Sequence, residues 1–310
     1  MTSVREFLII CGGCDYSSRA DYNDMLSYNT VSSVWKRYQP PVQLDVSNHP
    51  KICSFDNKMA AIKIDSLVSL DVTNSKWDIL FFRTEEDNVP PPILLRIIFC
   101  YNESLYVFGN RLDDNQSDED TSDDEEYLHD SRKVTYKFCL QTSTWSLVQQ
   151  IGGIPNFYDE IHVKVFNNQL YIFDPYSVET NKFTQVTIFD LSNNKWTTRA
   201  TNSKNIQFPS LRGNEAYAFS SDCAYMSGGR TLDRTAHFSD IWRMDFESLE
   251  WIKLDYECVT IDCQLSMIAT YIELEGGLET GLFSIEWNVS LLEFHYSIVY
   301  PSNLYADHRV

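Results

Sequence analysis

The feature that most constrains the fold of this chain is a short phrase ending in tryptophan, which occurs five times. In every copy an apolar or aromatic residue stands seven positions before the Trp, and a polar turn lies between them. The five copies are residues 28–35, 70–77, 138–145, 189–196 and 244–251. Repeats on this scale decide the architecture, because each unit buries its apolar face only against its neighbours. The sequence therefore predicts one repeat fold.

An apolar run with strand character precedes each phrase, and it often ends at a glycine pair. The clearest runs are 7–11 before Gly12-Gly13, 105–108 before Gly109-Asn110, and 224–227 before Gly228-Gly229. Glycine after a buried strand lets the backbone turn sharply and pack closely. We expect each Trp to fill the space against the neighbouring unit.

This order of strand, glycine pair, loop, aromatic residue, turn and Trp resembles the kelch repeat. The five tryptophans are 42 to 68 residues apart, around the kelch period of roughly 50 residues. The resemblance implies an all-β, kelch-type β-propeller of four-stranded blades. We expect six blades over residues 1–287, the last one imperfect, with residues 288–310 as a C-terminal tail. The chain is expected to begin at the second strand of blade one, which leaves closure of the ring open.

The charge of the chain is strongly negative and unevenly distributed. The net charge is −19, which disfavours nucleic acid and anionic membranes as partners. Residues 113–126 hold nine acidic and no basic side chains. We expect a disordered insertion over 112–130, between the second and third strands of its blade. It is either a solvated insertion or a docking arm for a basic partner.

The C-terminal third carries a second, more specific resemblance. It is similar to the family of kelch domain-containing protein 10, through residues 208–212, 240–244, 249–254, 282–285 and 290–294. This resemblance implies a non-enzymatic substrate-recognition subunit of a cullin-RING ubiquitin ligase, with elongin B–C and cullin-2 as partners. The alternative is a kelch scaffold or regulator of a signalling complex without a ligase link.

The same resemblance implies an elongin C-binding helix in the tail. Ser290 and Leu291 would begin it, with Leu291 as the anchor, and Val299 would end it. His295 stands where such helices carry a small residue, so the sequence departs from the pattern there. The alternative is that this segment is a last strand or helix packed on the propeller.

Three arginines are candidates for peptide binding on the loop-bearing face. In the ligase-linked relatives this face binds the C-terminus of a target protein, and a terminal carboxylate needs a fixed cation. Arg212 and Arg96 are expected at equivalent positions of their blades, and Arg230 directly follows a glycine pair. The alternative is that they form surface or inter-blade ion pairs.

The sequence offers little support for a catalytic function or a metal site. The pair Cys11 and Cys14 brackets the first glycine pair, and no second Cys-x-x-Cys or histidine cluster follows. We therefore expect no catalytic residues, no metal and no cofactor. The scattered cysteines indicate a reducing compartment, and no apolar run is long enough for a signal peptide core or a membrane span. The expected location is the cytoplasm, and also the nucleus.

Overall fold

The computed structural model describes most of the 310-residue chain. The described residues are 2–11, 14–15, 20–21, 25–41, 50–63, 65–84, 90, 93–111, 133–155, 161–173, 182–213, 215–233, 235–236, 238–257, 268–272, 281–288 and 293–299.

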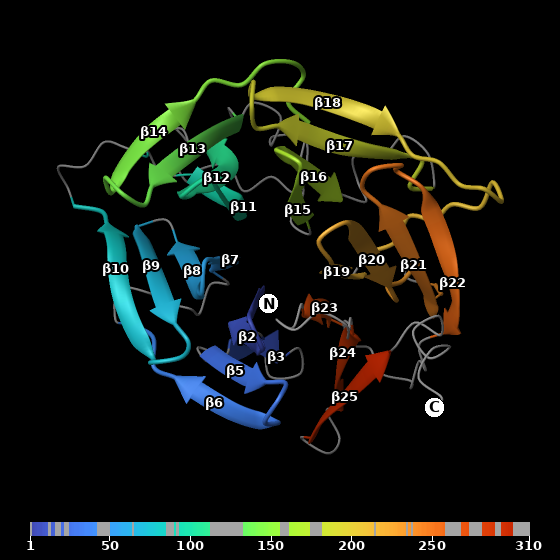
Figure 1. Cartoon of the computed structure of the whole chain (residues 1–310), viewed down its shortest axis with the longest axis horizontal. Helices are drawn as coiled ribbons and strands as arrows, with labels where there is room; N and C mark the ends of the chain where they lie inside the picture. The colour runs from blue at the N-terminus through green and yellow to red at the C-terminus, as the bar shows by residue number, and fades with distance from the viewer. Residues whose placement is uncertain are drawn as a thin grey trace, which may run out of the picture.

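Antiparallel sheets are arranged around a central axis, as Figure 1 shows. Blade one contains β1 (Thr2–Val4), β2 (Phe7–Cys11), β5 (Met25–Asn29) and β6 (Val34–Tyr38). Blade two contains β7 (Lys51–Phe55), β8 (Lys58–Lys63), β9 (Ser66–Asp71) and β10 (Lys76–Phe82). Blade three contains β11 (Ile93–Tyr101), β12 (Ser104–Arg111), β13 (Lys133–Cys139) and β14 (Thr144–Val148). Blade four contains β15 (His162–Phe166), β16 (Gln169–Phe173), β17 (Gln185–Asp190) and β18 (Lys195–Ala200). Blade five contains β19 (Ala216–Phe219), β20 (Cys223–Ser227), β21 (Asp240–Asp245) and β22 (Trp251–Glu257).

Within the described residues, blade six has three strands. They are β23 (Ile268–Ile272), β24 (Gly281–Asn288) and β25 (Glu293–Val299). A separate hairpin consists of β3 (Cys14–Asp15) and β4 (Ala20–Asp21). The prediction of an all-β propeller with an imperfect terminal blade is thus confirmed.

Two details of the ends differ from the sequence-based expectation. The three-residue strand β1 forms the inner strand of blade one, so β2 is indeed a second strand but the chain does not begin there. The strand β25 continues blade six beyond the expected boundary at residue 287. The inner strand β23 contacts both β19 and β1, so blade six lies between blades five and one.

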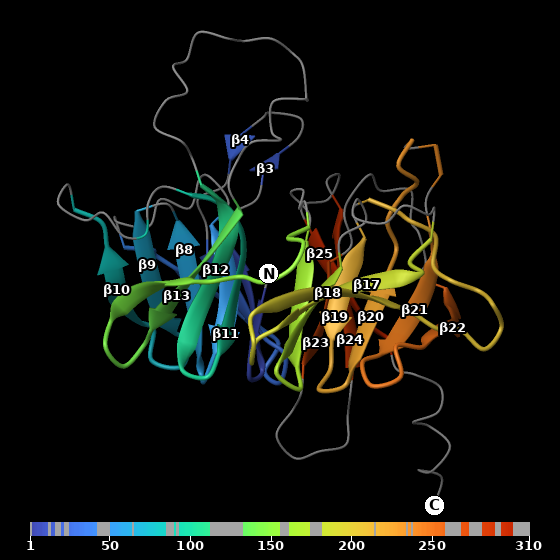
Figure 2. The same ribbon diagram turned by 90° about the horizontal axis from the view of Figure 1, so that it is seen from above.

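The propeller has a tight-turn face and a loop-bearing face. On the tight-turn face, first and second strands, and third and fourth strands, are joined by short turns with residues at positive φ, such as Asp56 and Ser75. The connections between second and third strands lie on the opposite face, where the β3–β4 hairpin projects (Figure 2). The acidic segment 112–132 joins β12 to β13, as expected, and lies outside the described residues.

The tryptophans of blades three to five pack between blades, as their repetition predicted, whereas Trp35 is 37% exposed and its ring lies against Tyr28 of its own blade. Trp145 lies edge-on to Phe81 of blade two, with ring centroids 5.7 Å apart. Trp196 contacts Phe108 of blade three in the same way, at 5.4 Å. Trp251 contacts Phe173 of blade four. Each of these three indole rings therefore packs against the preceding blade, which helps to hold blades two to five together.

Candidate functional site

The loop of residues 228–238, here called the blade-5 loop, connects β20 to β21 on the loop-bearing face. It begins with the glycine pair after β20. Gly228 and Gly229 have φ values of 66° and 88°, which L-residues rarely adopt. A Cβ on Gly229 would also lie 3.1 Å from the Cδ of Arg212 and from the carbonyl oxygen of Gly213. Glycine is needed here both for the backbone conformation and for the space that Arg212 occupies.

Arg212 is a completely buried residue that fixes the base of this loop. Its Nε donates to the carbonyl of Ser210 at 3.0 Å, and its Nη1 donates to the carbonyl of Gly228 at 3.0 Å. Nη1 also forms an ion pair with Oδ1 of Asp240 at 2.5 Å. The guanidinium carbon lies 3.8 Å from the ring centre of Phe238. These contacts tie the linker before β19 to both ends of the blade-5 loop.

Asp240, the first residue of β21, is the anionic partner in this arrangement. Burial alone would raise the pKa of its carboxyl group. The hydrogen bond and the charge of Arg212 outweigh burial, with further help from the Trp242 indole and from Lys253, and hold the pKa below its usual value. The Trp242 Nε1 donates to Oδ2 of Asp240 at 2.7 Å. The carboxylate is thus charged and fully engaged at neutral pH.

The outer part of the blade-5 loop is held by short-range hydrogen bonds. Arg230 and Gly213 exchange two backbone hydrogen bonds of 2.9 Å, which begin the loop. Thr231 donates its backbone N–H to the carbonyl of Ala236, and its hydroxyl accepts from the backbone N–H of Thr235 at 3.1 Å. Leu232 remains 47% exposed near the tip. The loop therefore presents an apolar side chain on an ordered support.

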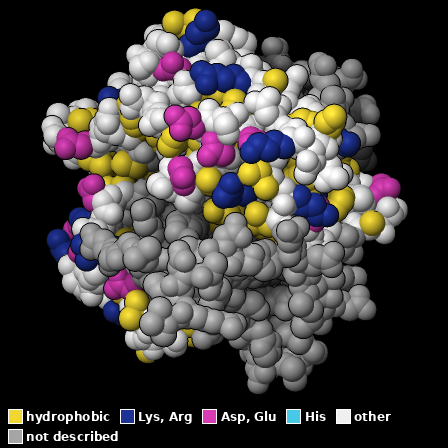
Figure 3. All heavy atoms as spheres, turned by 45° about the vertical axis from the view of Figure 1, so that its right-hand side comes forward, with side chains coloured by type: hydrophobic (Ala, Val, Ile, Leu, Met, Phe, Trp, Pro, Cys, Tyr) yellow, Lys and Arg dark blue, Asp and Glu magenta, His cyan; other side chains and the backbone are white. Residues whose placement is uncertain are grey.

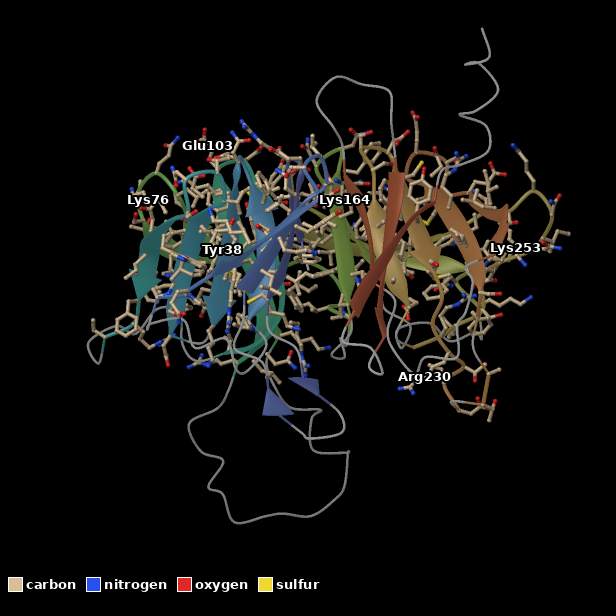
Figure 4. All side chains as sticks on the ribbon, turned by 90° about the horizontal axis from the view of Figure 1, so that it is seen from below. Tyr38, Lys76, Glu103, Lys164, Arg230 and Lys253 are labelled. Atoms are coloured by element: carbon tan, nitrogen blue, oxygen red, sulfur yellow. The ribbon has the colours of Figure 1, made fainter. Side chains whose placement is uncertain are left out.

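The three candidate arginines lie in different environments. Arg212 takes the ion-pair role that was the alternative to peptide binding. Arg96 lies in β11, is buried, and has its pKa lowered by that burial. Arg230 is partly exposed, and Figure 4 shows it on the loop-bearing face, opposite Glu103 and Lys76. Arg230 is thus the only one of the three that reaches the surface to a substantial extent.

The expected equivalence of Arg96 and Arg212 is wrong. Arg96 lies within the inner strand, at a bulge between Leu95 and Ile97. Arg212 precedes the inner strand β19 by several residues and lies beside the blade-5 loop. Arg96 lies level with Phe108 and Gly109, whereas Arg212 lies beyond Gly213, which pairs with Arg230 after the glycine pair. The sequence pattern did not reveal this offset.

The described part of the C-terminal segment, residues 293–299, is a strand and not a helix. Residues 293–299 pair antiparallel with β24, with His295 opposite Glu286 and Val299 opposite Leu282. This is the strand form of the alternative considered for the segment. Ser290 and Leu291 lie outside the described residues. The alternation of apolar and polar residues from Phe294 onward has the period of two that suits a strand.

In the described part of the chain, no group of three or more His, Cys, Asp or Glu side chains could hold a metal ion. Burial raises the pKa of the Cys11 thiol to about 11, which makes it a poor nucleophile. No helix among these residues could span a membrane.

Sequence reasoning missed Asp240, Phe238 and Leu232. The sequence held a partial signal for Asp240. An acidic residue at the start of the third strand and an arginine before the first strand carry opposite charges, so they could form an ion pair. Nothing in the one-dimensional spacing, however, places the Phe238 ring against Arg212 or brings Leu232 to the loop tip, because both depend on the path of the loop.

One comparison with known proteins identifies a family. A family model described as the KLHDC2/KLHL20/DRC7 kelch-repeats domain matches residues 55–264. A search of curated proteins found no match.

Proposed function

The chain belongs to the KLHDC2/KLHL20/DRC7 family of kelch-repeat domains, and from this premise we propose that its loop-bearing face binds a segment of a target protein. The observation that carries the proposal is the blade-5 loop. A buried Arg212–Asp240 ion pair fixes its base, while Arg230 and Leu232 face outward. An ordered loop loses little conformational entropy on binding, so it favours association.

The finer proposal is that Arg230 contacts the C-terminal carboxylate of the target. A planar guanidinium can donate two parallel hydrogen bonds to a carboxylate. Leu232 would contact an apolar side chain of the same peptide. Arg212 acts as a positioning residue, because its donors are used inside the protein.

A peptide-binding experiment tests this proposal. A pool of degenerate decapeptides is synthesised once with free C-termini and once with C-terminal amides, and binding to the full chain is measured by fluorescence polarisation. We expect the free-carboxylate pool to bind more tightly, and Arg230→Ala to remove the difference. Arg199→Ala, at an exposed arginine of β18, is the matched control. Equal binding of the two pools contradicts carboxylate capture.

We further propose that the chain serves as a substrate-recognition subunit of a cullin-RING ubiquitin ligase, with elongin B–C and cullin-2 as partners. The resemblance of residues 208–212, 240–244 and 249–254 to ligase-linked kelch proteins supports this. The strand conformation of 293–299 does not favour docking through a helix there, so elongin binding would require this segment to leave blade six.

Co-purification of elongin B–C decides between the ligase role and a scaffold without a ligase link. The full chain and its Leu291→Ala variant are expressed with tagged elongin B–C and purified in parallel. The ligase proposal predicts retention by the wild type and loss with Leu291→Ala. No retention by the wild type leaves the scaffold or regulator of a signalling complex as the function.

A further inference from the structure

A groove lies along the outer edge of blade five, away from the loop-bearing face. It is bounded by β22 and by residues 203–207, here called the arm, which lead from blade four toward blade five. The hollow has a volume of about 710 Å³. The residues that line it are Ser203, Lys204, Asn205, Gln207, Trp242, Glu250, Trp251, Ile252, Lys253 and Leu254.

The groove exists because the linkers into blades four and five take different paths. The linker into blade four stays close to the outer strand of its sheet, whereas the linker into blade five leaves the outer strand. In blade four, Ile151 pairs with the start of β18, and a Cβ on the next residue, Gly152, would lie only 3.0 Å from the Trp196 carbonyl oxygen. In blade five, Asn202 pairs with Glu250 in the same way. The following residue is Ser203, where the arm begins.

The edge of β22 beyond this single bridge is open among the described residues. The strand is the last one in its sheet. Asn202 donates to the Leu249 carbonyl at 2.7 Å and accepts from the Trp251 N–H at 2.8 Å, which uses only the first outward-facing groups. Because the outward-facing residues alternate along a strand, the next outward groups are the carbonyl of Trp251 and the backbone groups of Lys253. An extended segment could continue the pairing that Asn202 begins.

The indole of Trp251 supplies a second donor without a partner. Trp251 is 2% exposed and lines the groove, and its Nε1 has no acceptor among the described residues. In blade four the Trp196 Nε1 donates to Gln150 at 2.7 Å. Thr201 stands at the position of Gln150, but its hydroxyl donates to the Phe183 carbonyl. Buried donors are normally paired, so the Trp251 indole is available to donate to a bound segment, although the equivalent Trp145 Nε1 of blade three also has no acceptor among the described residues.

The arm itself is strained and exposes an apolar side chain. Ile206 has a φ of 55° and is 82% exposed. A β-branched residue at positive φ is a clear outlier, and such strain is concentrated at binding sites. Ile206 stands between Asn205 and Gln207, which both line the groove.

The charge of the groove indicates the chemistry of its occupant. Its lysines are Lys204 and Lys253, and its one carboxylate, Glu250, lies 3.6 Å from the Lys204 amine. The lining is thus weakly cationic in a protein of net charge −19. Figure 3 shows apolar side chains between basic and acidic ones on the face that it brings forward. We propose that the groove binds an extended, acidic segment of a partner protein by strand addition to β22. This goes beyond the proposed function, because the loop-bearing face takes no part in it.

Capped peptides test the proposal separately from carboxylate capture at Arg230. The probe is an eight-residue peptide of alternating Val and Glu, acetylated and amidated, so that it carries no terminal carboxylate. Its binding to the full chain is followed by fluorescence polarisation and by the NMR signal of the Trp251 indole N–H. We expect binding and a downfield shift of this signal. Lys253→Glu should weaken binding by about tenfold, because it exchanges attraction for repulsion.

Three controls make the result decisive. Lys195→Glu, at an exposed lysine of blade four, should leave the affinity unchanged. A Val–Lys peptide, and a Val–Glu peptide with alternate N-methylated amides, should bind at least about tenfold more weakly. Equal binding of the N-methylated peptide, an equal effect of Lys195→Glu, or no binding of the Val–Glu peptide at millimolar concentration overturns the proposal. A concentration-dependent dimer that Lys253→Glu abolishes would show that a second copy is the occupant, and would also overturn it.

Discussion

At the scale of single residues, one position of the repeated turn shows how the same geometry gives different chemistry. Six positions before the Trp, four copies carry Asn29, Asp71, Asp190 and Asp245, whose side-chain oxygens accept backbone N–H groups of the turn. The third copy has Cys139. Hydrogen bonds from the Thr142 side chain, and then from the amides of Thr142 and Gln141, lower the pKa of its thiol. The turn that accommodates a carboxylate in blades two, four and five thus favours the thiolate form of Cys139 here.

Cys139 should therefore react fastest among the cysteines whose surroundings are described. Burial raises the thiol pKa of Cys11, Cys100 and Cys223 to about 11, so these are almost fully protonated at neutral pH. Brief treatment of the native protein with iodoacetamide, followed by peptide mass spectrometry, should find Cys139 modified well before those three. Modification of Cys100 or Cys223 at the same rate contradicts this.

The Arg212–Asp240 pair carries a second prediction. Asp240→Asn leaves a buried guanidinium without its counter-ion and should lower the free energy of unfolding by about 3 kcal/mol at pH 7. Because the folded pKa of Asp240 is depressed, the stabilisation is present above the unfolded value of about 3.9 and is lost as pH falls through the folded pKa. Urea denaturation at several pH values should show wild type and variant converging below about pH 4. A constant difference down to pH 2 would refute the linkage.

At the scale of strands, the two ends of the repeated phrase lie opposite each other on neighbouring strands. Phe138 lies opposite Trp145, and Phe189 lies opposite Trp196. The failures of prediction from sequence have physical causes. The strand β1 is too short to give a periodic signal, and the bulge beside Arg96 depends on contacts between strands. The arm and its groove depend on how one linker leaves the neighbouring blade, which local patterns do not encode.

Replacing each of two glycines by alanine should have different effects on stability. Gly109 lies in blade three, and Gly153 lies in the linker that follows it. Gly109 lies in β12 opposite Leu95, and a Cβ there would be 2.3 Å from the Leu94 carbonyl oxygen. Gly109→Ala must displace backbone at the β11 bulge and should destabilise the fold by about 1–3 kcal/mol. Gly153→Ala meets nothing within 4 Å and should change stability by less than about 0.5 kcal/mol. Chemical denaturation of both variants checks this, and equal effects would contradict the close approach at Gly109.

At the scale of the whole molecule, the ring separates a structural face from a variable one. The tight-turn face repeats nearly the same turn in five blades, with residues at positive φ closing each one. The loop-bearing face carries the blade-5 loop and the connection between β12 and β13 that holds the nine acidic residues. The sequence predicted the propeller itself and an acidic insertion between the second and third strands of its blade. It did not distinguish the buried Arg212 from the surface Arg230, because that distinction depends on the folded path of the blade-5 loop.

Hydrogen–deuterium exchange tests most directly whether the loop-bearing face binds the target. The full chain is measured alone and with the tightest-binding member of the free-carboxylate peptide pool. Binding through the blade-5 loop predicts slower exchange over residues 228–238, with the tight turns at 72–75 and 191–194 unchanged. Slower exchange at those turns, with 228–238 unaffected, would contradict the account.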